Sequence, residues 1–170
     1  MVALNAPVGD EKTLQAIAIA IAMALVVGSA LGFEHIGGYI PCALCLEQRT
    51  PYYLGVPVMI AAALCAAFKA PPLVTRLLFV VGGALMLYGA GLGGYHSGVE
   101  WGVWEGPADC GGAVSVPTDA GNLIGELGKK PPACKEPALR VFGLSFAGWN
   151  VLASIALAYA CLRGAVTGKS

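Results

Sequence analysis

The sequence predicts an all-α membrane protein, a bundle of four transmembrane helices with one long polar loop. The chain of 170 residues is 57% hydrophobic and only 12% charged, whereas soluble domains carry about 25% charged residues. Its apolar residues gather in four stretches, each close to or within the roughly 17–25 residues that a helix needs to cross a bilayer core. Backbone polar groups in lipid must pair within the chain, which favours helices over an open sheet.

Each of the four helices follows from its own apolar stretch. The first is uncharged and longer than the ~7–15-residue core of a signal peptide, and acidic Asp10 and Glu11 precede it, so we expect it to remain uncleaved. We expect one membrane domain over residues 1–170, with helices at about 14–33, 51–68, 74–95 and 140–162 and longer loops at about 34–50 and 96–139.

The start of the second helix has two interpretations. Thr50 followed by Pro51 is a favourable pair for the N-cap and first turn of a helix, so the helix either begins at Pro51 or begins near Cys45 and bends. The choice affects how far Arg49 lies from Cys45.

The distribution of Lys and Arg predicts the orientation of the bundle. On one side, five basic residues lie in short segments beside helix ends: Lys12, Lys69, Arg76, Arg163 and Lys169. On the other side, five are spread over longer loops: Arg49, Lys129, Lys130, Lys135 and Arg140. Basic residues concentrate in short cytoplasmic segments. We therefore expect both termini in the cytoplasm and the cysteine loops outside, where disulfides persist.

Some residues within the spans are expected to serve packing. Gly89 and Gly93 form a pair of small residues that permits close approach of two helices, and Asn150 is suited to a hydrogen bond between helices. Cys65 and Cys161 lie in apolar surroundings, where a cysteine behaves as a small buried hydrophobe.

The long loop carries apolar residues of its own. Trp101 and Trp104 suit a membrane–water boundary. A possible short amphipathic helix on the bilayer surface follows Thr118 and Asp119, with apolar residues at Leu123, Ile124 and Leu127. The alternative is a loop packed on the helix ends.

The candidate chemistry centres on Cys42 and Cys45, which form a CxxC motif at the edge of a span. This spacing permits a disulfide and can place one sulfur near a helix N-terminus, which lowers its pKa. Arg49 follows about one turn later and would stabilise a thiolate or bind a carbonyl ligand, although it could also simply snorkel to the membrane surface. A structural disulfide and a metal site remain alternatives for the motif. A zinc site normally needs four ligands, and His35 and His96 could complete one with the two cysteines, but we expect no metal.

A second cysteine pair, Cys110 and Cys134, lies in the long loop on the same side of the membrane. It is either a structural staple or an exchange partner for the CxxC, since a loop can bring one sulfur to another. His96, at the end of the third span, can carry protons near neutral pH, and Glu47 and Gln48 are either ligands or surface residues. Two thiol pairs on one face suggest electron transfer between protein disulfides and the bilayer. The net charge of zero and the lack of a basic patch predict no nucleic-acid partner.

Several segments together resemble the disulfide bond formation protein B (DsbB) family. They are PCALCLEQR at 41–49, YHSGVEWG at 95–102, the loop with Cys110 and Cys134, and FGLSFAGWN at 142–150. The likeness spans nearly the whole chain. It implies an inner-membrane four-helix bundle that reoxidises a periplasmic DsbA-like thioredoxin-fold dithiol oxidase and passes electrons from its cysteines to ubiquinone or menaquinone.

The resemblance also implies roles for the cysteines. Cys110 would be attacked by the partner's thiolate, and Cys134 would be released to exchange with Cys42. Cys45 would be the thiolate beside the quinone ring. Quinone-linked oxidation of periplasmic thiols is a known system.

Two further residues would bind the cofactor beside Cys45. Arg49 would polarise the quinone and support the thiolate, and His96 would lie near the ring and assist its protonation. One departure is Gln48, because the family often has an acid immediately before the arginine.

Two other functions are weighed against this one. A vitamin K epoxide reductase-like protein also couples loop cysteines to a CxxC, but its loop pair would precede the CxxC, whereas here Cys42 comes first. A non-enzymatic membrane scaffold or metal-binding module would hold its external cysteines as permanent disulfides.

Overall fold

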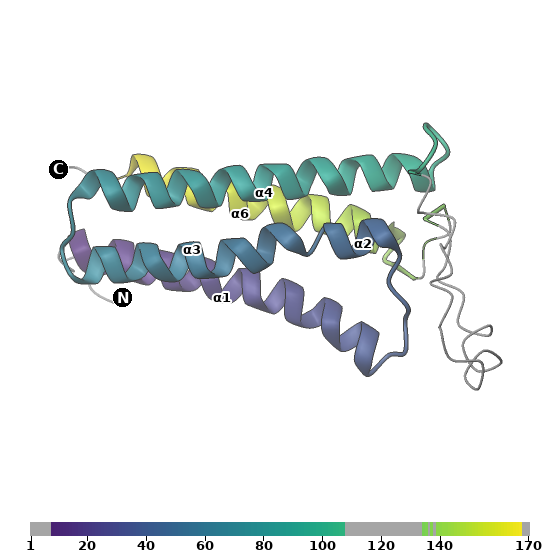
Figure 1. Ribbon diagram of the computed structural model, residues 1–170, viewed down its shortest axis with the longest axis horizontal. Helices are drawn as coiled ribbons and strands as arrows, with labels where there is room; N and C mark the ends of the chain where they lie inside the picture. Colours follow the sequence, from purple (N-terminus) through teal and green to yellow (C-terminus); the bar gives the residue numbers. More distant parts are fainter. Residues whose placement is uncertain (1–7, 108–133, 136, 138, 168–170) are drawn as a thin grey trace, which may run out of the picture.

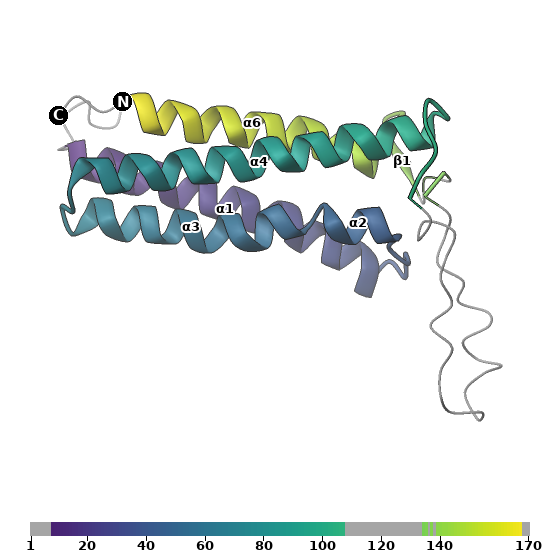
Figure 2. The same ribbon diagram turned by 45° about the horizontal axis from the view of Figure 1, so that its top comes forward.

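The computed structural model describes residues 8–107, 134–135, 137 and 139–167. Within this part, four helices are long and apolar enough to cross a membrane, which confirms the four-helix membrane bundle. They are α1 (Val8–His35), α3 (Thr50–Ala67) with the short helix that precedes it, α4 (Pro72–Glu100) and α6 (Phe146–Val166), and they lie side by side (Figures 1 and 2). The possible amphipathic helix around Leu123, and Cys110, lie outside the described residues.

The second span is divided at the Gln48–Arg49 step. A short helix, α2 (Ala43–Glu47), begins just after Cys42, and α3 begins at Thr50 with Pro51 in its first turn. Proline has no N–H to donate, and its ring clashes with the carbonyl of the residue four positions earlier, here Glu47. The two interpretations from the sequence are thus each partly right, since one helix begins near Cys45 and another at Thr50.

The last span starts later than the expected residue 140. Residues Arg140–Val141 (β1) and Leu144–Ser145 (β2) pair as an antiparallel hairpin. Phe142 and Gly143 form its turn with φ of 51° and 84°. The Ser145 hydroxyl then accepts a hydrogen bond from the Gly148 N–H at 3.3 Å, which caps α6.

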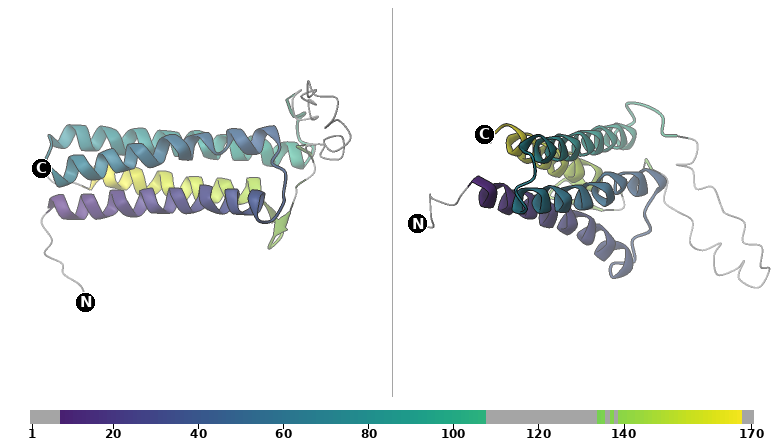
Figure 3. Two further views of the ribbon diagram at one scale, coloured as in Figure 1. Left: turned by 60° about the horizontal axis from the view of Figure 1, so that its bottom comes forward. Right: turned by 60° about the vertical axis from the view of Figure 1, so that its left-hand side comes forward.

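The bundle is closely packed at one end and diverges at the other. α1 packs mainly on α3, and α4 mainly on α6, around a core that includes Met23, Met59, Phe79 and Met86. The described ends of α1 and α6 that lead to the chain termini lie together (Figure 3). Toward the opposite end, which carries α2, α1 moves away from the other helices (Figure 1).

Gly93 provides the close approach of α4 to α6 that the sequence predicted. A Cβ at Gly93 would lie 2.9 Å from Val151 Cγ2 and 3.1 Å from the Ala147 carbonyl oxygen, whereas a Cβ at neighbouring Gly94 would have nothing within 4 Å. We expect Gly93→Ala to destabilise the protein by about 1–3 kcal/mol through overpacking.

Gly94→Ala is the matched control, and it should be neutral or stabilise the helix by about 0.5–1 kcal/mol. Thermal unfolding in detergent, followed by helical circular dichroism, would compare the two variants. Equal unfolding midpoints would contradict the assignment of Gly93 to the α4–α6 contact.

Candidate redox site

Cys42 lies at the start of α2 and acts as its N-cap. The extended backbone at Cys42 turns its sulfur back over the helix, where it accepts a hydrogen bond from the Cys45 N–H at 3.3 Å. The two sulfurs lie 2.8 Å apart, share a hydrogen bond, and are both free thiols. Cys42 is only 5% exposed. The CxxC is therefore present as a dithiol rather than a disulfide, and the Cys42 sulfur lies at a helix start.

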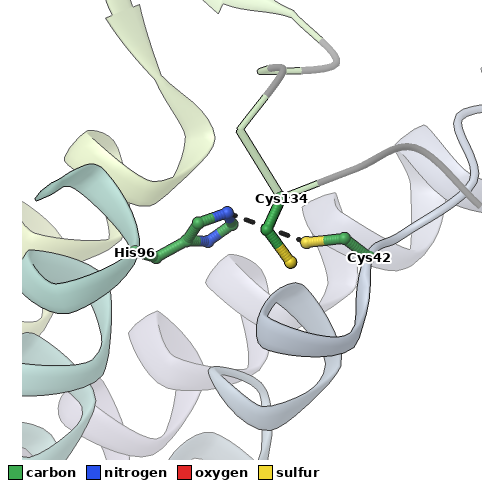
Figure 4. Close-up of side chains that lie close together, drawn as sticks. All are labelled: Cys42, His96 and Cys134. Carbon is green, nitrogen blue, oxygen red and sulfur yellow. Dashed lines mark hydrogen bonds between the residues drawn. The ribbon is translucent and has the colours of Figure 1, made fainter. Parts of the chain in front are cut away.

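Cys134, in the C-terminal part of the long loop, lies close to the CxxC. It is 2% exposed and disulfide-bonded. Its sulfur, the Cys42 sulfur and a ring nitrogen of His96 all lie within 4.8 Å of one another (Figure 4). Leu44 and Val99 pack around this group. A disulfide sulfur next to a free thiol is the geometry that thiol–disulfide exchange requires.

The same three residues do not form a convincing metal site. Zinc is held by thiolates or imidazoles, usually in sets of four. The Cys134 sulfur is already in a disulfide, and His35 does not belong to the cluster. The donor set therefore fits sulfur exchange better than metal binding.

The surroundings of Cys42 favour its thiolate. They lower the pKa of Cys42 to about 4, first through the hydrogen bond from the Cys45 side chain and then through the hydrogen bond and electrostatic attraction of His96 and the Cys45 N–H. Burial acts in the opposite direction and is outweighed. Because this pKa lies below the ordinary value, the thiolate of Cys42 persists to a lower pH than the thiolate of an ordinary cysteine.

Replacing Cys45 with alanine should raise the pKa of Cys42 toward its ordinary value of 9.0, because the largest stabilising hydrogen bond is lost. Cys45→Ser keeps a hydroxyl donor and should retain much of the lowering. The ultraviolet absorbance of the thiolate, followed against pH with Cys42→Ser as the blank, measures both variants. Identical titrations of the alanine and serine variants would contradict the role of this hydrogen bond.

His96 is held from both sides of its ring near the end of α4. It is 3% exposed. Its Nδ1 lies 2.7 Å from Gln48 Nε2, and its Nε2 lies 3.7 Å from Cys42 Sγ and 3.8 Å from Glu100 Oε1. The other Glu100 oxygen is buried without a hydrogen-bond partner among the described residues. The structure thus brings His96 to the CxxC across 54 residues of sequence.

Gln48 is a buried polar residue whose role the sequence left undecided. It is 6% exposed, whereas Glu47 is on the surface. Asn150 Nδ2 donates to Gln48 Oε1 at 2.8 Å, and the Tyr52 hydroxyl donates to Asn150 Oδ1 at 2.8 Å. Asn150 is therefore the interhelical hydrogen-bonding residue that was expected. Tyr52 was missed, because a tyrosine near a membrane boundary usually only faces the interface.

A cavity of about 340 Å³ lies beside the thiols, where α1 diverges from α6. Its lining is mainly apolar and includes Val26, Ala30, Phe33, Tyr39, Phe146 and Trp149. Cys45, Arg49 and His96 also line it. The Arg49 guanidinium is paired with the Glu34 carboxylate from α1, a partner that the sequence reading missed. The cavity can hold a largely apolar ring and presents a cation and a sulfur to it.

These features define a multi-pass membrane protein with a buried cluster of thiols beside an apolar cavity. The family model described as disulfide bond formation protein DsbB matches residues 12–163, and the chain belongs to this family. It is also similar to the uncharacterized protein RP370 of Rickettsia prowazekii (strain Madrid E), with 26% identity over 149 residues that cover 86% of this chain and 83% of the relative. No solved structure matches the chain significantly. Family membership supports a membrane oxidoreductase of protein disulfide formation.

Proposed function

We propose that the protein is a thiol:quinone oxidoreductase that reoxidises a periplasmic DsbA-like thioredoxin-fold oxidase and passes the electrons to ubiquinone or menaquinone. One observation carries the proposal. The Cys134 disulfide sulfur lies within 4.8 Å of the Cys42 thiol, and Cys42 and Cys45 both line the apolar cavity. A disulfide sulfur and an apolar cavity beside the same CxxC support electron transfer from the loop cysteines to an acceptor in the membrane.

The proposed first exchange takes place in the long loop. A thiolate of the reduced partner attacks Cys110 of a Cys110–Cys134 disulfide, and Cys134 leaves as a thiolate. The second thiol of the partner then releases Cys110 and leaves the partner oxidised. The disulfide bond of Cys134 supports this pairing, since Cys42, Cys45, Cys65 and Cys161 are all free.

The second exchange moves two electrons to the CxxC. Cys134 attacks Cys42 of a Cys42–Cys45 disulfide, and Cys45 leaves as a thiolate. Cys110 then attacks Cys134, which restores the loop disulfide and frees Cys42. The dithiol and the bonded Cys134 of this structure correspond to that product.

The cavity residues would hold a quinone, which when bound would supply an acceptor for the two electrons and two protons that the Cys42–Cys45 dithiol gives up on forming its disulfide. The residues present fit such a ring, because the cavity is apolar and Arg49 can donate to a carbonyl oxygen. His96, whose Nε2 lies 3.7 Å from Cys42 Sγ, would hold a proton at its edge. No metal is needed for this sequence of steps.

We further propose that the protein lies in the bacterial inner membrane with both termini in the cytoplasm and the cysteine loops in the periplasm. The CxxC, Cys134 and α2 gather at one end of the bundle, while the chain-terminal ends of α1 and α6 lie at the other. This grouping supports the orientation expected from the density of basic residues.

The test is quinone reduction by the purified protein in detergent, with a reduced thioredoxin-fold dithiol partner and quinone absorbance as the readout. We expect turnover that disappears in Cys45→Ser and persists in Cys65→Ser, since Cys65 is a free thiol near the C-terminal end of α3, far along the helix from the CxxC. Absence of turnover with ubiquinone and menaquinone analogues would reject the proposal. Failure to trap a mixed disulfide through Cys110 in Cys134→Ala would instead support the scaffold alternative.

A further inference from the structure

We propose that Gln48 is a positioning residue that fixes the tautomer of His96, so that the neutral imidazole carries its proton on Nε2, the nitrogen facing Cys42. The two ring nitrogens of a neutral histidine are distinct, and the partner of one decides the state of the other. The consequence for turnover rests on the proposed function, whereas the tautomer itself does not.

The first step is the orientation of the Gln48 side-chain amide. Its Nε2 lies 3.3 Å from the Leu44 carbonyl oxygen, which can only accept a hydrogen bond. Its Oε1 accepts from Asn150 Nδ2 at 2.8 Å. Exchanging the nitrogen and oxygen of Gln48 would place oxygen against oxygen at Leu44 and nitrogen against nitrogen at Asn150. The Gln48 nitrogen therefore faces His96.

The second step is the orientation of Asn150, on which the first depends. Its Nδ2 also donates to the Gly89 carbonyl oxygen at 3.3 Å, and again a backbone carbonyl can only accept. Its Oδ1 accepts from Tyr52 at 2.8 Å and from Ser154 at 3.4 Å. The orientations of the two side-chain amides are thus fixed by two backbone carbonyls, that of Leu44 in α2 and that of Gly89 in α4.

The third step is the ring itself. Gln48 Nε2 donates to His96 Nδ1 at 2.7 Å, so Nδ1 must offer its lone pair, and the proton of a neutral ring resides on Nε2. That nitrogen faces the Cys42 sulfur at 3.7 Å and Glu100 Oε1 at 3.8 Å. The backbone of Cys134 also hydrogen-bonds the imidazole. Cys42 and Glu100 are the titratable groups that contact the ring, and both accept hydrogen bonds when ionised.

In this tautomer, His96 can donate a hydrogen bond from Nε2 to the Cys42 sulfur that takes part in the exchange. An Nε2–H can stabilise a thiolate at Cys42 as it leaves Cys134 or returns to Cys45. The opposite tautomer would place a lone pair against that thiolate and would repel it. Gln48 lies on the far side of the ring from Cys42 and acts only through His96.

The test is nitrogen NMR of the full chain in detergent with ¹⁵N-labelled histidine. The chain has only 2 histidines, and His35→Gln assigns the signals of His96. We expect the wild-type ring, observed at a pH at which it is neutral, to show a protonated Nε2 and an unprotonated Nδ1. A protonated Nδ1 with an unprotonated Nε2, or an equal mixture of tautomers, would overturn the proposal without the need for any variant of Gln48.

Gln48→Glu provides the matched variant, because it keeps the shape of the side chain and the acceptor for Asn150. A glutamate at this position accepts from Nδ1 instead of donating to it, so we expect Nδ1 to gain a proton while the helical circular dichroism stays unchanged. An unprotonated Nδ1 in this variant would also contradict the proposal. Quinone turnover is measured in a separate experiment. If the spectra are as expected but the protein shows no turnover, the proposed function is rejected and the tautomer assignment stands.

Discussion

With Cys45 and Cys110 both replaced by serine, Cys42 and Cys134 are expected to form a disulfide with each other almost completely under mild oxidation by diamide. Their sulfurs lie within 4.8 Å, and both side chains are nearly buried. The two replacements remove the competing partners, and Cys45→Ser still offers a hydroxyl to the Cys42 thiolate. The bond formed is the one that joins the two cysteine pairs in the proposed exchange.

Peptide mapping by mass spectrometry, after blocking of free thiols, would quantify this bond. Cys65 and Cys161 serve as internal controls, because both are free thiols, and the Cys161 sulfur contacts Met59. They should remain available for alkylation after unfolding. A product in which Cys42 stays reduced, or is linked mainly between two chains, would contradict the placement of Cys134 beside it.

Replacing Arg49 with glutamine is expected to lower quinone reduction by about 10²–10³-fold, the range found when one preorganised donor to a developing oxyanion is removed. The same change should also destabilise the protein, because it leaves the Glu34 carboxylate without the cation to which it is paired. Breaking a buried pair by removing one partner costs about 3–5 kcal/mol. This pair is only partly buried, so a smaller loss is expected.

The double variant Glu34→Gln with Arg49→Gln separates these two effects. Removing both charges should restore much of the thermal stability, because no unpaired carboxylate remains. It should not restore turnover, since the cavity still lacks its cation. Recovery of turnover together with stability would mean that Arg49 acts only through folding. Glu34→Gln alone should fold and retain activity.

Features that depend on local composition could be predicted from the sequence. Uncharged stretches long enough to cross a bilayer predicted the four helices, because lipid leaves helices as the simplest way to pair the backbone. The CxxC at a helix start, the close approach at Gly93 and the hydrogen-bonding role of Asn150 followed from single residues and their spacing. The start of α6 did not, because the apolar run from Val141 hid the hairpin turn at Phe142 and Gly143.

Contacts between distant segments were decided only by the tertiary structure. Gln48 meets His96 across 48 residues and Asn150 across 102 residues, and Glu34 pairs with Arg49 from a different helix. Such contacts depend on how each helix is rotated and tilted, which packing sets and hydrophobicity alone does not. The sequence by itself therefore determined which residues carry thiol chemistry and that they sit at a membrane edge. The tertiary structure decided which sulfur faces which, because one buried hydrogen-bonded network joins α2, α3, α4 and α6 around them.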